Sequence, residues 1–163
     1  MLQILKSSIP QILRFIGRFS SSLDNGFGVD RALVRAMSQA DELASRVRAF
    51  AIRVVQFART LPRSPATDGV VRQLCDAATS ESANYHAARR GRSRREFVAK
   101  LGVVAEEADE TEHWLAILDG VGVVSNASAV EELASLKEEA TELRAIFVRS
   151  VTTARANLAK QTR

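Results

Sequence analysis

The sequence has little of the residues that build several common kinds of protein. Its 163 residues include one cysteine, three prolines, one tyrosine and one tryptophan. A single cysteine excludes a disulfide framework within the chain and a cysteine-rich zinc site, and it suits a reducing compartment. The 46% of apolar residues argues against disorder, and the scarcity of β-branched and aromatic runs argues against a β-sandwich. We therefore expect a cytoplasmic, helical protein whose length fits one folded domain.

Long apolar runs are also missing, which bears mainly on the N-terminal segment. Residues 1–19 combine leucines and isoleucines with Lys6, Arg14 and Arg18, so we expect a cationic amphipathic helix there. It is too short and too charged to span a bilayer, and its arginines interrupt the apolar region that a secretory signal needs. A membrane is therefore not an expected partner, although this segment by itself is suited to rest on an anionic lipid surface.

The small polar residues and glycines of segment 20–28 predict a linker after this extension. We divide the chain into an N-terminal amphipathic extension and linker, residues 1–36, and a bundle domain, residues 37–163. A wrongly assigned upstream start codon is another explanation of the extension.

Charge is unevenly distributed along the chain. Residues 1–95 carry 16 basic and 7 acidic side chains, whereas residues 96–163 carry 7 basic and 12 acidic ones. The overall charge of +4 therefore results from partial cancellation between a basic part and an acidic part. Most of the basic residues are arginines, which suit phosphate and carboxylate partners better than lysines do.

Four stretches show apolar residues at alternating spacings of three and four, the pattern of a helix with one buried face. The first helix is expected to end at Pro62, the second to begin at a cap on Asp68, and the other two to begin at capping boxes formed by Ser93 with Glu96 and Ser128 with Glu131. Short connections between four amphipathic helices predict an all-α, antiparallel up-down-up-down four-helix bundle. The predicted core stripes are Leu43, Val47, Phe50, Val54, Phe57 and Leu61; Val71, Leu74, Ala78, Ser82 and Tyr85; Phe97, Leu101, Val104, Ala108, Thr111, Leu115 and Leu118; and Leu133, Leu136, Ala140, Leu143, Phe147, Val151, Ala154 and Leu158.

The middle of the chain contains a series of short motifs: Ser82-Ala83-Asn84-Tyr85, Arg92-Ser93-Arg94-Arg95-Glu96-Phe97, Lys100-Leu101-Gly102, Glu107-Ala108-Asp109-Glu110-Thr111-Glu112 and Trp114-Leu115. Together they resemble the 23S rRNA intervening-sequence protein family, whose members are also called four-helix bundle proteins. The resemblance covers roughly residues 41–155 and implies a small bacterial bundle that assembles into a homopentamer and has no known catalytic activity. It also implies a link to nucleic acid, because related proteins with this fold serve as nucleic-acid-binding accessory factors of diversity-generating retroelements. Many members have Asn-Ile-Ala-Glu-Gly where this chain has Asn84-Tyr85-His86-Ala87-Ala88, so roles of that glutamate and glycine do not carry over.

A cluster of arginines surrounds the predicted loop between the second and third helices of the bundle. In an up-down bundle this loop lies at the same end as the start of the first helix and the end of the fourth, so that end should be strongly basic and should attract polyanions. The functional interpretation is contact with the phosphates of RNA or DNA. The alternative is a solvated loop whose arginines pair with acids of a neighbouring subunit, such as Glu106, Glu107 or Glu112. The candidate nucleic-acid-binding residues are Arg89, Arg90, Arg92, Arg94, Arg95, Arg46, Arg155 and Lys160.

A second group of residues is predicted to have structural roles. Asn84 and Asp109 lie beside the core stripes, where a polar group needs a partner on another helix or another subunit. Tyr85, Glu110 and Trp114 are assigned with them to the packing between helices or subunits. Because the aromatic residues are few, stacking on bases has little support.

Catalytic and metal sites are not expected. Two histidines do not complete a Ser/His/Asp constellation, and no glycine-rich phosphate loop follows a strand. Glu110 and His113 have the Glu-x-x-His spacing of ferritin-like metal sites, but the second such motif is missing. We therefore expect a non-enzymatic protein without cofactor.

Two functions remain open from the sequence. The first is a homo-oligomeric bundle, a pentamer by resemblance, that binds nucleic acid through its basic end without sequence specificity. The second is a structural or adaptor protein that docks a protein partner encoded nearby.

Overall fold

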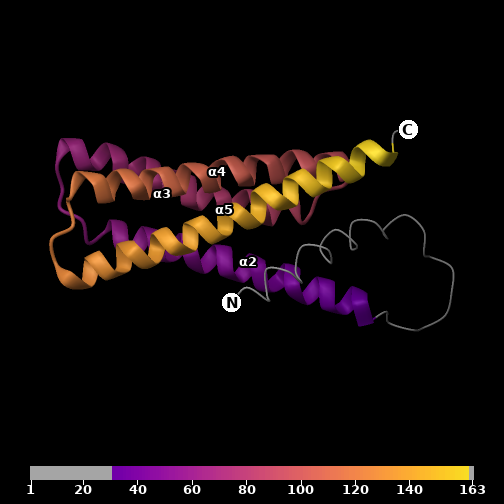
Figure 1. Cartoon of the computed structure of the whole chain (residues 1–163), viewed down its shortest axis with the longest axis horizontal. Helices are drawn as coiled ribbons and strands as arrows, with labels where there is room; N and C mark the ends of the chain where they lie inside the picture. Colours follow the sequence, from indigo (N-terminus) through magenta and orange to yellow (C-terminus); the bar gives the residue numbers. More distant parts are fainter. Residues whose placement is uncertain (1–30, 162–163) are drawn as a thin grey trace.

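The computed structural model describes residues 31–161 of the chain, with side chains from residue 38 to residue 160. Four helices follow one another: α2 (Arg31–Ala58), α3 (Pro65–Ala88), α4 (Arg94–Val121) and α5 (Ala127–Gln161). Their antiparallel arrangement, seen in Figure 1, confirms the predicted all-α four-helix bundle. The predicted amphipathic helix and linker of residues 1–28 lie outside the described residues. Helix α2 begins at Arg31 and so crosses the boundary that we drew between residues 36 and 37.

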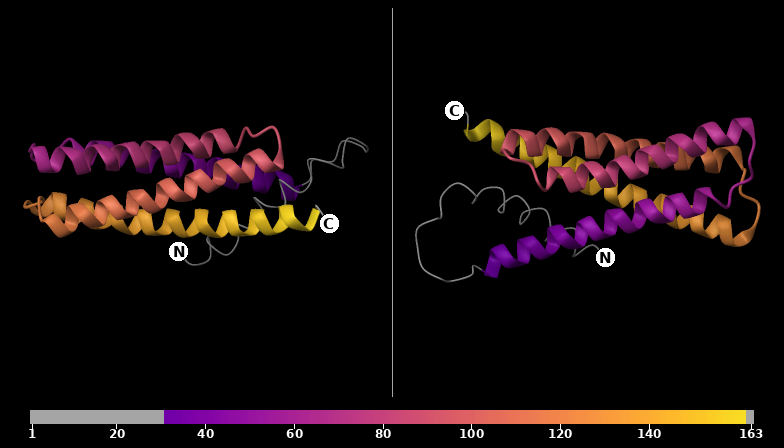
Figure 2. Two further views of the ribbon diagram at one scale, coloured as in Figure 1. Left: turned by 90° about the horizontal axis from the view of Figure 1, so that it is seen from above. Right: turned by 180° about the vertical axis from the view of Figure 1, so that it is seen from behind.

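Each helix packs on the one that follows it, and α5 closes the bundle against α2, so α4 lies diagonally across from α2. Figures 1 and 2 show that α2 and α5 diverge toward the end at which α2 begins and α5 ends. The α3–α4 loop lies at that same end, which carries the candidate arginines. We call it the basic end.

The core confirms the four predicted stripes. Phe50, Leu74, Leu115 and Phe147 are completely enclosed, and nearly every other predicted core residue is buried; Leu43, Val71, Ser82, Phe97 and Leu158 are partly buried. Burying a side chain the size of leucine or phenylalanine stabilises a fold by about 1.5–3 kcal/mol relative to exposure. The hydrophobic seam is therefore sufficient to explain why these helices associate.

The ends of the helices correct three details of the prediction. Helix α3 begins at Pro65, not at Asp68: the Ser64 hydroxyl accepts from the Thr67 amide at 3.1 Å, and proline suits the first helical position because that amide is free in any helix. Asp68 lies in the first turn and bonds to Arg63.

Helix α4 begins as predicted with Ser93 capping the Glu96 amide at 3.1 Å, but the Glu96 carboxylate accepts from the Arg92 amide, not from Ser93. At the start of α5 the predicted Ser128 cap is wrong. The Asn126 side chain accepts from the Ala129 amide at 2.8 Å and caps the helix two residues earlier.

Within residues 31–161, no helix is both long and apolar enough to cross a membrane.

Candidate nucleic-acid interface

The α3–α4 loop forms a tight turn that holds the arginine cluster in place. The Gly91 amide donates to the Ala88 carbonyl at 3.0 Å, and the Arg90 amide donates to the Ala87 carbonyl at 3.1 Å. A methyl group on Gly91 would meet the Ala88 oxygen at 3.1 Å and the Phe97 amide nitrogen at 3.3 Å. Glycine therefore suits this position, because a side chain would be crowded against the backbone where the chain turns from α3 into α4, with arginines on both sides.

Two arginines of the loop are held by acids of the same chain. Arg89 forms an ion pair with Asp41 of α2 and ties the loop to that helix. Arg92 lies 3.6 Å from Glu96, and its amide donates to the same carboxylate at 2.9 Å. This hydrogen bond from the Arg92 amide, together with the positive charge of the Arg92 side chain, lowers the pKa of Glu96.

The remaining arginines of the loop differ in how much of them reaches the solvent. Arg90 and Arg95 are exposed, and so is Arg92 despite its ion pair, whereas Arg94 is half-buried. The Arg90 guanidinium lies 3.4 Å from Nε2 of His86, one turn earlier on α3. Three guanidinium groups are thus available to an anion in solution: Arg90, Arg92 and Arg95.

The candidates from α2 and α5 occupy different places. Arg46 donates to Glu139 of α5 at 2.6 and 2.8 Å and also to Glu142, so its charge is compensated inside the bundle and not presented with the loop. Arg155 is exposed on α5 and lies over Gly102 of α4, where an added methyl group would meet its guanidinium at 3.3 Å.

Lys160 is exposed at the end of α5. The structure therefore places Arg155 and Lys160 on the helix that ends at the basic end, and it assigns Arg46 to the contact between α2 and α5.

Asn84 and Tyr85, two of the residues predicted to have structural roles, make their contacts within the same chain. The Asn84 side-chain amide donates to the Ser80 carbonyl of its own helix at 3.0 Å. It does not make the predicted hydrogen bond to another helix of the chain. Tyr85 is buried and packs at 5.2 Å against the ring of Phe147 on α5. Burial raises the pKa of its hydroxyl to about 12, and a ring enclosed in this way is not available to stack on a base.

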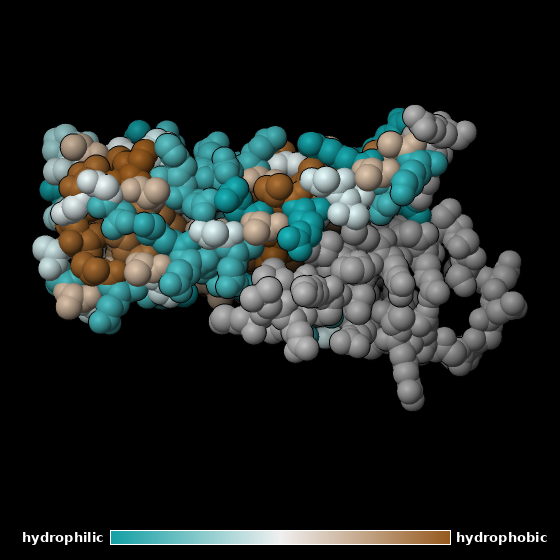
Figure 3. Space-filling view, viewed as in Figure 1, coloured by the Kyte–Doolittle hydropathy of each residue, from teal (hydrophilic) through white to brown (hydrophobic). Residues whose placement is uncertain are grey.

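The other three predicted structural residues are on α4. Asp109 is exposed and lies 3.7 Å from Arg144 of α5, an ion pair between helices and not the hydrogen bond that we predicted. Trp114 is half-buried with its ring 5.2 Å from that of His113, and Glu110 is exposed. Figure 3 shows that hydrophilic residues cover much of the visible face, while hydrophobic residues gather near the end opposite the basic one.

Comparison with known proteins shows which family this bundle belongs to. A sequence profile described as 23S rRNA-intervening sequence protein matches residues 41–159. The chain belongs to this family. Its fold is similar to the crystal structure of a protein of unknown function from the S23 ribosomal protein family of Bacteroides thetaiotaomicron, with a TM-score of 0.60 and 25% sequence identity over 69% of this chain and 97% of that chain. No curated protein matches the chain.

Sequence reasoning missed one prominent residue of this intervening-sequence protein. Glu81 of α3 is 1% exposed, and its Oε1 atom has no hydrogen-bond partner. Burial raises the pKa of its carboxyl to about 8, and the negative charges of Glu139 and Glu107 add to this rise, so Glu81 holds its proton at neutral pH. The spacing of Leu74, Ala78 and Glu81, with steps of four and three residues, indicates that Glu81 lies on the core stripe. We had assigned Ser82 to that place.

Metal chemistry has no support in the part of the family fold that the structure describes. None of the described histidines, cysteines and acids form a group of three that could hold a metal ion. His113 and Glu110, which have the spacing of a metal motif, are both exposed. Burial raises the pKa of the half-buried Cys75 thiol, which opposes a role as a nucleophile.

Proposed function

We propose that this member of the intervening-sequence family is a non-enzymatic, homo-oligomeric bundle that binds RNA or DNA through its basic end, without sequence specificity. One observation carries the proposal: a tight glycine-containing turn presents Arg90, Arg92 and Arg95 together to the solvent. Arginine binds phosphate oxygens with a rigid fork of donors, and each further arginine that neutralises a phosphate adds to the affinity for a nucleic-acid backbone.

The lack of sequence specificity follows from what the basic end does not offer. Tyr85, the one tyrosine of the chain, is enclosed in the core, and Trp114 lies well inside α4, far from its first turn. Contacts limited to phosphates fix position and strength of binding but do not read bases. Self-association would place several basic ends in one particle and so raise the apparent affinity for a long polyanion.

The first test uses two fluorescein-labelled single-stranded RNAs of unrelated sequence, with binding followed by fluorescence anisotropy. We expect similar affinities for both RNAs and a decrease of at least tenfold when Arg90, Arg92 and Arg95 are replaced by alanine. The control replaces Arg63, Arg72 and Arg149, exposed arginines away from the α3–α4 loop, and removes the same charge. Equal binding by the two variants would contradict the assignment of the site.

The proposed assembly has its own test. The pentamer is implied by the family resemblance, and light scattering coupled to size exclusion should then report about five chains per particle. A monomer at micromolar concentration would contradict self-association without touching the arginine site.

An adaptor that docks a protein partner is the second candidate function. The exposed acids of α4, Glu106 and Glu110, favour it because they form no ion pair among the described residues and offer a charged surface to a basic partner. Recovery of one protein and no nucleic acid from the purified native assembly would support this candidate over the first.

A further inference from the structure

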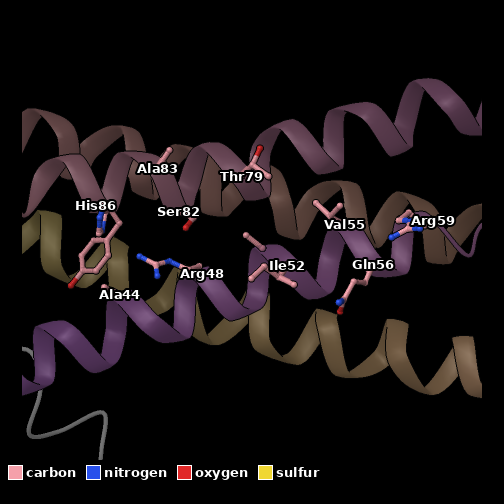
Figure 4. Close-up of a pocket in the computed structure, with 12 residues that line it drawn as sticks. Ala44, Arg48, Ile52, Val55, Gln56, Arg59, Thr79, Ser82, Ala83 and His86 are labelled. Atoms are coloured by element: carbon pink, nitrogen blue, oxygen red, sulfur yellow. The ribbon is translucent and has the colours of Figure 1, made fainter.

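A groove runs along the outer face of α2 and α3 and has a volume of about 390 Å³. Figure 4 shows Ile52 and Val55 of α2 in the middle of this groove, with Arg48 on one side of them and Arg59 on the other. The four residues follow at spacings of four, three and four, so they form one continuous stripe on α2. The groove thus has an apolar centre and a positive charge at each end.

The apolar centre is unusually open to solvent. Ile52 is 50% exposed and Val55 is 36% exposed, and both belong to the small set of large apolar side chains that the described surface leaves uncovered. Two such residues side by side, with a groove next to them, are typical of a surface that another chain covers.

The arginines of α2 fall into two sets that differ in their partners. Arg46 and Arg53 point toward α5 and form ion pairs with Glu139 and Glu132. Arg48 and Arg59, on the groove side, have no ion-pair partner among the residues that the structure describes. The bundle therefore neutralises one face of α2 and leaves the other face positive.

A surface with the opposite charge lies on the outer side of α4. Val103 is 37% exposed, and Glu106 and Glu110 follow it at spacings of three and four, both exposed. Within the described residues these two glutamates form no ion pair, although Asp109 and Glu112 beside them pair with Arg144. This stripe is an apolar side chain followed by two negative charges about 6 Å apart along the helix.

We infer that the α2–α3 groove receives the outer stripe of α4 from a second copy of this chain, so that Val103 covers Ile52 and Val55 while Glu106 and Glu110 lie toward one end of the groove. Arg48 and Arg59 are 11 residues apart, about 16.5 Å along α2, so the two glutamates pair with the arginine at that end of the groove, and the arginine at the other end attracts them at longer range. Opposite charges on two apolar surfaces favour this pairing and disfavour contact of either surface with itself.

The position of the two surfaces sets the kind of assembly. Because α4 lies diagonally across the bundle from α2, one copy carries the groove and the complementary stripe on different faces. Such a contact is heterologous: each copy offers its groove to one neighbour and its α4 stripe to another, and the copies close into a ring when the rotation between them allows it. The inference rests on the proposed self-association and names the surfaces that bring it about.

The test reverses charge on each surface separately and then on both together. Arg48→Glu with Arg59→Glu, and Glu106→Arg with Glu110→Arg, should each dissociate the particle to smaller species at concentrations where the wild type is assembled. The variant with all four changes has the charges exchanged and should recover the wild-type mass. The control, Arg63→Glu with Arg149→Glu, makes the same change of charge away from the groove and should keep that mass. Light scattering gives the mass, and far-UV circular dichroism checks that each variant is folded.

Each outcome decides a different point. Wild-type mass in both double variants would overturn the inference while self-association stands. Dissociation of both without recovery in the fourfold variant would show that the two surfaces do not face each other. A monomeric wild type would overturn self-association itself. Dissociation by the groove variant alone, with the α4 variant still assembled, would overturn the pairing and mean that the groove holds another part of the chain.

Discussion

Glu81 provides the sharpest test of the core, because it places an ionisable group among completely buried side chains. Burial, aided by the charges of Glu139 on α5 and Glu107 on α4, raises its pKa from the ordinary value of 4.5 to about 8. Arg46 of α2, the cation that faces Glu139, is already bonded to Glu139 and Glu142. The folded protein therefore keeps a proton on Glu81 at pH 7, whereas the unfolded chain releases it.

This difference makes stability depend on pH. Below pH 4.5 both the folded and the unfolded state hold the proton, so the ionisation of Glu81 does not change the free energy of unfolding. Between pH 4.5 and about 8 the unfolded state binds fewer protons, so the free energy of unfolding falls by about 1.4 kcal/mol for each pH unit. At pH 7 the decrease reaches about 3 kcal/mol, and above pH 8 both states are ionised and the decrease stops growing.

The perturbation is Glu81→Gln, which keeps the size of the side chain and removes the titration. We expect the stability of the variant minus that of the wild type to rise by about 1.4 kcal/mol per pH unit from pH 5 to 8. Urea unfolding followed by circular dichroism at pH 5, 6, 7 and 8, at one protein concentration, measures this slope. Other titrating groups are shared by both proteins and cancel in the difference.

Glu138→Gln is the matched control, since it makes the same change on an exposed side chain of α5, and the slope of Glu81→Gln should be clearly steeper than that of the control. A difference between Glu81→Gln and the wild type that stays constant across the pH range would refute the reasoning. It would mean that Glu81 is ionised in the folded protein or finds a partner there.

Three further substitutions test the packing and the turns, each by urea unfolding against the wild type. Phe147→Ala removes a completely buried ring in contact with Tyr85 and should cost about 3–5 kcal/mol; a decrease under about 1 kcal/mol would contradict the core. Arg46→Ala leaves two glutamates beside the core unpaired and should destabilise by about 1–3 kcal/mol; an unchanged stability would contradict a structural role for this contact between α2 and α5. Gly122→Ala forces a side chain into a backbone with φ of 69° and should cost about 1 kcal/mol, whereas Gly120→Ala has open space and should cost less.

Much of the fold could be predicted because the hydrophobic spacing is regular. Each stripe keeps steps of three and four over five or more residues, and this fixes both the helix and its buried face. Helix starts were less predictable, since several polar residues near a boundary can cap. Ser64 and Asn126 cap in place of Asp68 and Ser128 because each lies one residue before the helix proper, with its oxygen on an amide three residues ahead.

The candidate site was predictable in position but not in detail. Five arginines around one loop locate the basic end from the sequence alone. Which of the candidate arginines remain free depends on neighbours from distant parts of the chain, such as Asp41 for Arg89 of the loop and Glu139 for Arg46 of α2. These pairings follow from how α2 sits against α3 and α5, which no local pattern contains.

Glu81 shows the other limit of sequence reasoning. A glutamate is rarely buried without a partner, so composition alone argues against placing it in a core. The regular steps through Leu74, Ala78 and Tyr85 nevertheless put position 81 inside, and the structure follows the spacing and not the residue type.

The central claim, that exposed arginines at the basic end hold nucleic acid by its phosphates, is tested most directly by the salt dependence of RNA binding. Phosphate contact predicts that the logarithm of the association constant falls linearly with the logarithm of salt concentration. Replacing Arg90, Arg92 and Arg95 by alanine should lower the affinity and should make the slope less steep by about 2, because three arginines no longer displace counterions from a single strand. RNA binding that does not change with salt, or a slope that is the same in the variant, would contradict the claim.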